Sequence, residues 1–181
     1  MGIINNIRIK REDNAKDLKD FNCGIKEMDY FIHFKLDNFL ADHTNQLFIA
    51  RNENDCIIGM FVLSEGYFFD EQENFIDAPA YGKPFAILDK MNGKTKLIKR
   101  YSTIEIEYLA INKEFREKGI GRKILQAIHE VSKQQNTHFI TVDAYCTMNY
   151  NAVPFYEKCG FCLLENQDRT YDTVRMVYQI E

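Results

Sequence analysis

The segment from Thr103 to Gln135 constrains the fold most, because it predicts a strand, a glycine-containing turn and a helix in immediate succession. Residues Ile104 to Ile111 alternate and are rich in β-branched and aromatic side chains, which favours a strand partly covered on both faces. Beyond Gly121, apolar residues recur at helical spacing, at Ile124, Leu125, Ile128 and Val131. We therefore expect the helix to begin at the second glycine of the turn.

This turn is predicted to bind a diphosphate. Backbone N–H groups at a helix start have no acceptor within the helix, and the positive end of the helix dipole attracts anions. Arg116 and Arg122 flank the glycines and can add charge-assisted contacts. The dinucleotide fingerprint G-x-G-x-x-G fits less well, since Ile124 stands in place of its third glycine, and no Lys-Ser or Lys-Thr pair follows at P-loop spacing.

Length and composition indicate one folded domain, residues 1–181. Hydrophobic residues make up 45% of the chain, but no apolar run approaches the roughly 20 residues that span a bilayer, and no secretory signal is visible. The odd number of cysteines, five, favours reduced thiols and a cytoplasmic location. A net charge of −4 gives the whole molecule no electrostatic footprint for nucleic acid, and the basic run 94–100 is interpreted as a solvated loop.

The remaining segments predict a mixed order of helices and strands. We expect a strand at 7–9, a helix at 26–41, an antiparallel hairpin of 47–50 and 56–63, a strand at 138–144 that forms a parallel crossover with 104–111, a helix at 149–158 and a terminal hairpin of 161–164 and 173–180. Segment 64–101 is broken by glycine and proline, with one short helix expected near 86–91. Such an irregular segment is either a wall of a substrate site or a packed surface loop.

Two motifs follow one another along the chain: Arg116-x-x-Gly119-x-Gly121, and Asn149-x-x-Ala-x-x-Phe-Tyr156. Together they resemble the GNAT family of N-acetyltransferases, and the order of elements extends the resemblance over most of the chain. The resemblance implies an α/β (α+β) GNAT fold. This fold has a mixed central sheet with N-terminal antiparallel strands, a parallel β-α-β unit for acetyl-CoA, splayed central strands and helices on both faces.

The resemblance also implies acetyl-CoA as co-substrate, with no metal. The pyrophosphate is expected on the amides of the turn, which consists of Arg116, Glu117, Lys118, Gly119, Ile120, Gly121 and Arg122. The pantetheine arm is expected to pair with the backbone of Leu109, Ala110 and Ile111, where two parallel strands separate. Asn149 matches the family asparagine that orients this arm, and Asn151 is a second candidate.

The catalytic residues follow from the chemistry of amide formation. When an amine attacks the thioester directly in a ternary complex, the leaving thiolate needs a proton, and a phenol with an ordinary pKa near 10 can supply it. Tyr156 is our candidate general acid; the alternative is an aromatic residue that only packs. Glu105 and Glu107 lie on one face as i and i+2 and are candidates for the base that acts through water, unless they are ordinary surface carboxylates.

The acceptor is the open question. A small-molecule or protein amine is the first interpretation, and a non-catalytic acyl-CoA-binding module is an alternative from another class. A third interpretation rests on Phe21-x-Cys-Gly24-x-x-x-Met28-Asp29, which resembles a signature of acetyltransferase toxins that act on aminoacyl-tRNA. The acidic net charge and Tyr108, where those toxins place a basic residue, depart from that pattern. We expect a possible homodimer. An antitoxin or tRNA is expected as a partner only under the toxin interpretation, and no association with a membrane is expected.

Overall fold

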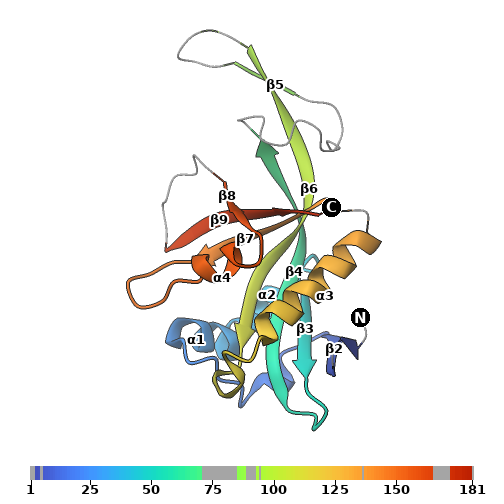
Figure 1. Cartoon of the computed structure of the whole chain (residues 1–181), viewed down its shortest axis with the longest axis vertical. Helices are drawn as coiled ribbons and strands as arrows, with labels where there is room; N and C mark the ends of the chain where they lie inside the picture. Colours follow the sequence, from blue (N-terminus) through green and yellow to red (C-terminus); the bar gives the residue numbers. More distant parts are fainter. Residues whose placement is uncertain are drawn as a thin grey trace.

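The computed structural model describes residues 3–4, 6–70, 85–88, 93, 95–135, 137–164 and 172–180. Within these ranges one mixed sheet of nine strands crosses the molecule in the order β1-β2-β3-β4-β6-β7-β9-β8, with β5 paired to β6 (Figure 1). The strands are β1 (Ile3–Ile4), β2 (Ile7–Glu12), β3 (Gln46–Arg51), β4 (Ile57–Asp70), β5 (Phe85–Leu88), β6 (Thr95–Ile111), β7 (Phe139–Tyr145), β8 (Cys162–Leu163) and β9 (Thr173–Gln179). The helices are α1 (Lys26–Phe34), α2 (Leu36–Leu40), α3 (Ile120–Gln134) and α4 (Val153–Glu157), with short 3-10 turns at Lys16–Leu18 and Lys113–Phe115. None of these helices is long and apolar enough to cross a membrane.

Most predicted elements are confirmed. The predicted hairpin is β3 and β4, and the predicted parallel crossover is β6, α3 and β7. The helix expected near 86–91 is wrong over the part that the structure describes, since β5 occupies Phe85–Leu88; residues 89–91 lie outside the described ranges. The basic run is not a loop either, because residues 95–100 belong to β6.

Three helix boundaries differ from the prediction. The helix at 26–41 is split at Lys35, whose φ of −122° ends α1 and precedes α2. Helix α3 begins at Ile120, one residue early, with Gly119 as its cap at φ 73°. The last helix begins only at Val153, because Pro154 has no N–H to donate to the Tyr150 carbonyl, which accepts from the Thr147 amide at 2.8 Å instead.

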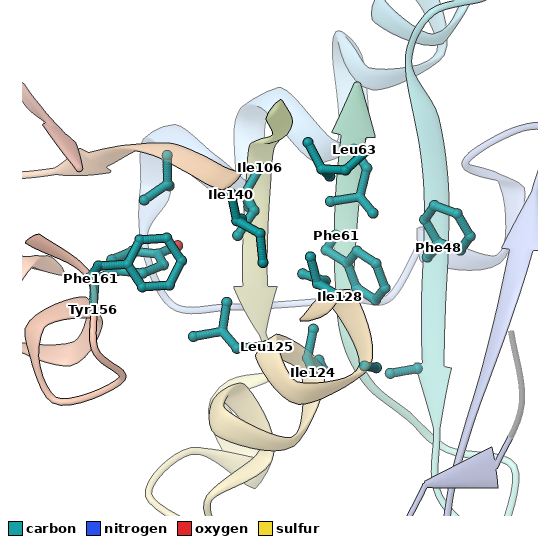
Figure 2. Close-up of a cluster of buried hydrophobic side chains, with 14 of the residues drawn as sticks. Phe48, Phe61, Leu63, Ile106, Ile124, Leu125, Ile128, Ile140, Tyr156 and Phe161 are labelled. Carbon is teal, nitrogen blue, oxygen red and sulfur yellow. The ribbon is translucent and has the colours of Figure 1, made fainter. Parts of the chain in front are cut away.

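Helices cover both faces of the sheet. Helices α1 and α2 pack on one face, against Leu47, Ile49, Met60 and Val62. Helix α3 packs on the other face, where its side chains Ile124, Leu125 and Ile128 meet the strands (Figure 2). Successive side chains of β3 and β4 point alternately toward α1 and α2 on one face and toward α3 on the other. Each of these strands is therefore apolar on both faces, as expected for a central strand.

The two central strands separate halfway along their length. Parallel pairing of β6 with β7 runs only from Ile104↔Ile140 to Ile106↔Val142, although both strands are described to their ends. Figure 1 shows β7 turning away from the lower half of β6. At the same level β6 carries a β-bulge, because Ile106 and Tyr108 face the consecutive residues Leu63 and Val62 of β4 and leave Glu107 extra. The sheet therefore opens where the predicted active site lies.

Candidate active site

A cavity of about 660 Å³ occupies the gap between the separated strands. One side, here called the backbone wall, consists of Leu109 to Ile111 at the end of β6 and the turn from Arg116 to Arg122. The opposite side, here called the side-chain wall, consists of Cys23, Ile25, Met28, Tyr150 and Tyr156. Of the predicted turn residues only Lys118 is absent from the lining; its Nζ donates to the Glu114 carbonyl at 2.9 Å.

The turn of the backbone wall presents amide groups toward the cavity. Glu117 and Gly119 have φ values of 60° and 73°, which turn the chain sharply into α3. The N–H groups of the first residues of α3, Ile120, Gly121 and Arg122, have no acceptor within the helix. A diphosphate can bind here, because the helix dipole and the lining side chains of Arg116 and Arg122 all favour an anion.

The two glycines of the turn serve different needs. Gly119 requires freedom in φ, and a Cβ there would meet nothing within 4 Å. Gly121 instead requires space, because a Cβ would lie 2.9 Å from Cζ of Phe155. The second glycine thus lets α4 pack against the start of α3, in addition to giving an anion close access.

The Phe21-to-Asp29 signature builds part of the side-chain wall. The Asp29 carboxylate accepts from the amides of Cys23 at 2.7 Å and Gly24 at 3.1 Å, and Gly24 adopts φ 80°. Phe21 is buried, and the carbonyl of Asn22 accepts from the amide of Lys113 at 2.9 Å. This loop is therefore tied to both α1 and the segment that leads into the turn. Sequence analysis did not assign these residues to the site, although the signature itself marked them.

Tyr156 lines the cavity. Its ring is buried, with its centroid 5.0 Å from that of Phe155 and 5.3 Å from that of Phe161, which lies beside it in Figure 2. Its hydroxyl has no hydrogen-bond partner among the described residues. Burial, with smaller contributions from Tyr150 and Cys159, holds the pKa of Tyr156 well above its ordinary value. The phenol is protonated at neutral pH with or without this shift, which is the form a general acid needs, and the raised pKa makes it a weaker acid than a free phenol.

The Cys23 thiol is a second group of this wall whose pKa is raised. Burial and the neighbouring Asp29 raise the pKa of Cys23 to about 12. Since the thiolate is the nucleophilic form, this cysteine is unreactive at neutral pH.

The two predicted glutamates lie beside the cavity and do not line it. Glu105 is paired with Arg175, which also contacts Asp143 at 3.1 Å, and Asp143 does line the cavity. Glu107 accepts a hydrogen bond from the Ser64 hydroxyl at 2.6 Å. Burial raises the pKa of Glu107, and the Ser64 hydrogen bond opposes that shift.

Neither predicted asparagine lines the cavity. Asn149 is exposed in the turn before α4, and the carboxamide oxygen of Asn151 accepts from the Val153 amide at 2.9 Å at the start of that helix. Asp143 and Arg175 were not predicted, because strand pairing brings them together, and Tyr150 was not predicted, because the turn held by Thr147 places it at the cavity. Among the described residues no group of three or more His, Cys, Asp or Glu side chains could hold a metal ion.

Comparison with known proteins agrees with this geometry. The model of the acetyltransferase (GNAT) family matches residues 12–161. A mutant of the toxin AtaT superposes with a TM-score of 0.68 at 16% identity, covering 99% of this chain and 93% of that one. AtaTR bound with AcCoA gives 0.64 at 17%, with 98% and 95% covered. AtaT complexed with acetyl-methionyl-tRNAfMet also gives 0.64 at 17%, with 96% and 94% covered.

The family match covers most of the chain, and the structural likeness gives the same fold, with splayed central strands and a glycine turn at the start of α3. The cavity, lined by the glycine turn, has the size and the cationic side chains that suit the donor this family uses. The chain therefore belongs to the GNAT acetyltransferase family and is an acetyl-CoA-dependent N-acetyltransferase.

Proposed function

We propose that this enzyme moves an acetyl group from acetyl-CoA directly to the α-amino group of an aminoacyl-tRNA, within a single domain of residues 1–181. The observation that carries the proposal is the near full-length likeness to AtaT, a toxin whose structure has been determined with acetyl-methionyl-tRNAfMet. The Phe21-to-Asp29 loop supports it, because this toxin-like signature forms the side-chain wall beside the predicted donor site.

The backbone wall is proposed to hold the donor. The amides of the turn, with Arg116 and Arg122, face the cavity and suit the diphosphate. The unpaired edge of β6 at Leu109 to Ile111 suits the pantetheine arm, which can add to a strand edge through main-chain hydrogen bonds. Asn149 and Asn151 remain predictions for this arm, and both would have to reorient, since their side chains lie outside the lining.

The chemistry needs proton transfers at the nitrogen and at the sulfur. The acceptor ammonium first loses a proton through water to a carboxylate, because only the neutral amine has a free electron pair. The amine nitrogen then bonds to the thioester carbonyl carbon, the C–S bond breaks, and Tyr156 gives its proton to the departing thiolate, while the second proton of the nitrogen returns to the tyrosinate through water. Glu107 is the better candidate base, because Glu105 is already paired with Arg175.

A second candidate acceptor is a cationic small-molecule or protein amine. Asp143 lines the cavity, and the three carboxylates of Glu105, Glu107 and Asp143 have only Arg175 as a counter-charge within the cluster. A negative field of this kind attracts an ammonium group and repels the phosphates of tRNA.

An acceptor competition separates the two candidates. The purified protein is incubated with radiolabelled acetyl-CoA and either aminoacyl-tRNA, deacylated tRNA, polyamines, amino acids or peptides, and both thiol release and acid-precipitable label are followed. We expect label on aminoacyl-tRNA and none on deacylated tRNA. Thiol release with a polyamine or peptide at comparable kcat/KM, and none with charged tRNA, would contradict the tRNA proposal.

The cellular counterpart of this experiment is expression of the wild-type chain in the bacterial cytoplasm, where charged tRNA is present. We expect growth arrest, relieved by an antitoxin encoded next to the gene. A Tyr156→Phe chain expressed to the same level is the matched control and should not arrest growth.

A further inference from the structure

We propose that the turn formed by residues 147–150 is a clamp that orients Arg116 toward the donor diphosphate, with Tyr150 as the contacting side chain. The inference rests on the proposed donor site and adds positioning residues to it. Tyr150 lies on the wall opposite the glycine turn, and nothing in the two sequence motifs assigns it a function.

The turn is held by one side chain, Thr147. Its hydroxyl accepts from the amides of Tyr150 at 3.1 Å and Asn149 at 3.3 Å, and donates to the Tyr150 carbonyl at 3.3 Å. The Thr147 amide donates to the same carbonyl at 2.8 Å, and a bridge between Cys146 and Asn151 closes the loop. Because these bonds are local, the backbone that carries the Tyr150 side chain is held in place without a ligand.

The Tyr150 ring reaches Arg116 across the cavity. The guanidinium carbon of Arg116 lies 5.9 Å from the ring centroid, which is within the range of a cation–π contact. On the other side, the Tyr145 ring centroid lies 6.2 Å from that of Tyr150. Both tyrosines and Arg116 line the cavity, so the Tyr150 ring contacts the Tyr145 ring and the Arg116 guanidinium within the same site.

This arrangement has a direct consequence for donor binding. A free arginine side chain loses rotamer entropy when it pairs with a phosphate, and a preset guanidinium loses less. The ring can stack on the flat face of the guanidinium and leave the N–H groups at its edge available to phosphate oxygens. Tyr150 should therefore strengthen binding through Arg116 and only for ligands that carry the diphosphate.

Calorimetric titration of the full chain tests the clamp. Tyr150→Ala should weaken coenzyme A binding about two- to fivefold, the range for an exposed cation–π contact, and Tyr150→Phe, which keeps the ring, should rescue it. Met148→Ala is the matched control, because Met148 lies in the same turn, fully exposed and outside the lining. Thr147→Val removes only the hydroxyl and should reproduce part of the loss.

Two further measurements assign the effect to Arg116. In an Arg116→Gln background Tyr150→Ala should cause no additional loss, and S-acetylpantetheine, which lacks the diphosphate, should bind equally to the wild type and Tyr150→Ala. The clamp would be overturned by unchanged coenzyme A affinity in Tyr150→Ala, or by a loss of affinity in the double variant equal to the product of the two single losses. Either result would leave the proposed function standing. If the wild type itself failed to bind coenzyme A, the donor site would be wrong and the clamp with it.

Discussion

The two walls of the cavity recognise ligands by different means. The backbone wall offers amide groups and a strand edge, so most of its side chains can vary without altering what it binds. The side-chain wall depends on particular residues, Cys23, Met28, Tyr150 and Tyr156, which come from segments far apart in the chain. We infer that the donor, the constant part of the substrate pair, binds mainly at the backbone wall, with Tyr150 acting through Arg116, and that the general acid and the choice of acceptor belong to the rest of the side-chain wall.

The largest expected effect lies on the side-chain wall. Tyr156→Phe removes one hydroxyl and keeps the packing between Phe155 and Phe161. If Tyr156 protonates the leaving thiolate, kcat should fall by about 10²- to 10⁴-fold while coenzyme A affinity stays the same. Steady-state kinetics and calorimetry measure the two quantities. Tyr30→Phe on the exposed face of α1 is the matched control, and equal turnover in both variants would remove Tyr156 from the mechanism.

Substitutions that add a side chain at the glycines of the backbone wall should lower the stability of the protein. Gly121→Val places a branched side chain against the Phe155 ring and should cost about 1–3 kcal/mol of unfolding free energy. It should also weaken coenzyme A binding. Gly121→Ala should cost less, because alanine regains about 1 kcal/mol of helix propensity. Denaturant unfolding measures the first effect.

Gly119→Ala separates conformation from bulk in the same turn. Its Cβ would meet nothing, so only the cost of placing alanine at φ 73°, about 1 kcal/mol, should remain. If Gly121→Val had the same free energy of unfolding as the wild type, the turn or the Phe155 ring would have moved to make room. The backbone wall would then be less rigid than its contacts indicate.

Asp29 provides a smaller test of how the side-chain wall is positioned. Asp29→Ala leaves the amides of Cys23 and Gly24 without their acceptor and should cost about 1–2 kcal/mol of unfolding free energy. Since that loop carries Cys23 and Ile25 into the cavity, acetyl-CoA turnover should fall as well. Asp42→Ala is the control, because the Asp42 carboxylate accepts only from the nearby Thr44. Equal losses in both variants would indicate a general effect of removing a turn carboxylate.

The two walls also differ in how far the sequence predicts them. Strand, glycine turn and helix are local patterns, so the backbone wall was predicted to within one residue at the start of α3. The contacts of Arg175 with Glu105 and Asp143 depend on strand pairing across the sheet, which local patterns do not encode.

Two local features also could not be predicted from the sequence. The bulge at Glu107 reverses the alternation of β6: Ile104 and Ile106 face the α3 side, whereas Tyr108 and Ala110 face the α1 side. Residues 108 to 111 are apolar without interruption and fit either phase equally well, so the alternation of residues 104 to 107 does not reveal the bulge. The turn at Thr147 was not predicted, and the helix was expected to begin at Asn149, because the competing hydrogen bonds of a threonine hydroxyl leave no distinct sequence pattern.

The smallest effect concerns Glu107, which lies behind both walls. Burial raises its pKa above the ordinary value of 4.5, so the folded protein holds this proton more tightly than the unfolded chain. Stability contributed by the protonated form is therefore lost as pH rises from about 4.5 through the folded-state pKa. Glu107→Gln should gain stability relative to the wild type at pH 7 and not at pH 4, as measured by urea unfolding.

Ser64→Ala should enlarge the same difference, because the Ser64 hydroxyl hydrogen bond is what opposes the rise in the pKa of Glu107. A smaller difference in Ser64→Ala would show that the hydroxyl does not stabilise the carboxylate. If Glu107 is also the base, the acid limb of kcat/KM should move to higher pH in Ser64→Ala, since the titration that sets stability is then the one that sets the rate. An acid limb that stays in place would restrict Glu107 to structure and leave the ammonium proton to water or to Asp143.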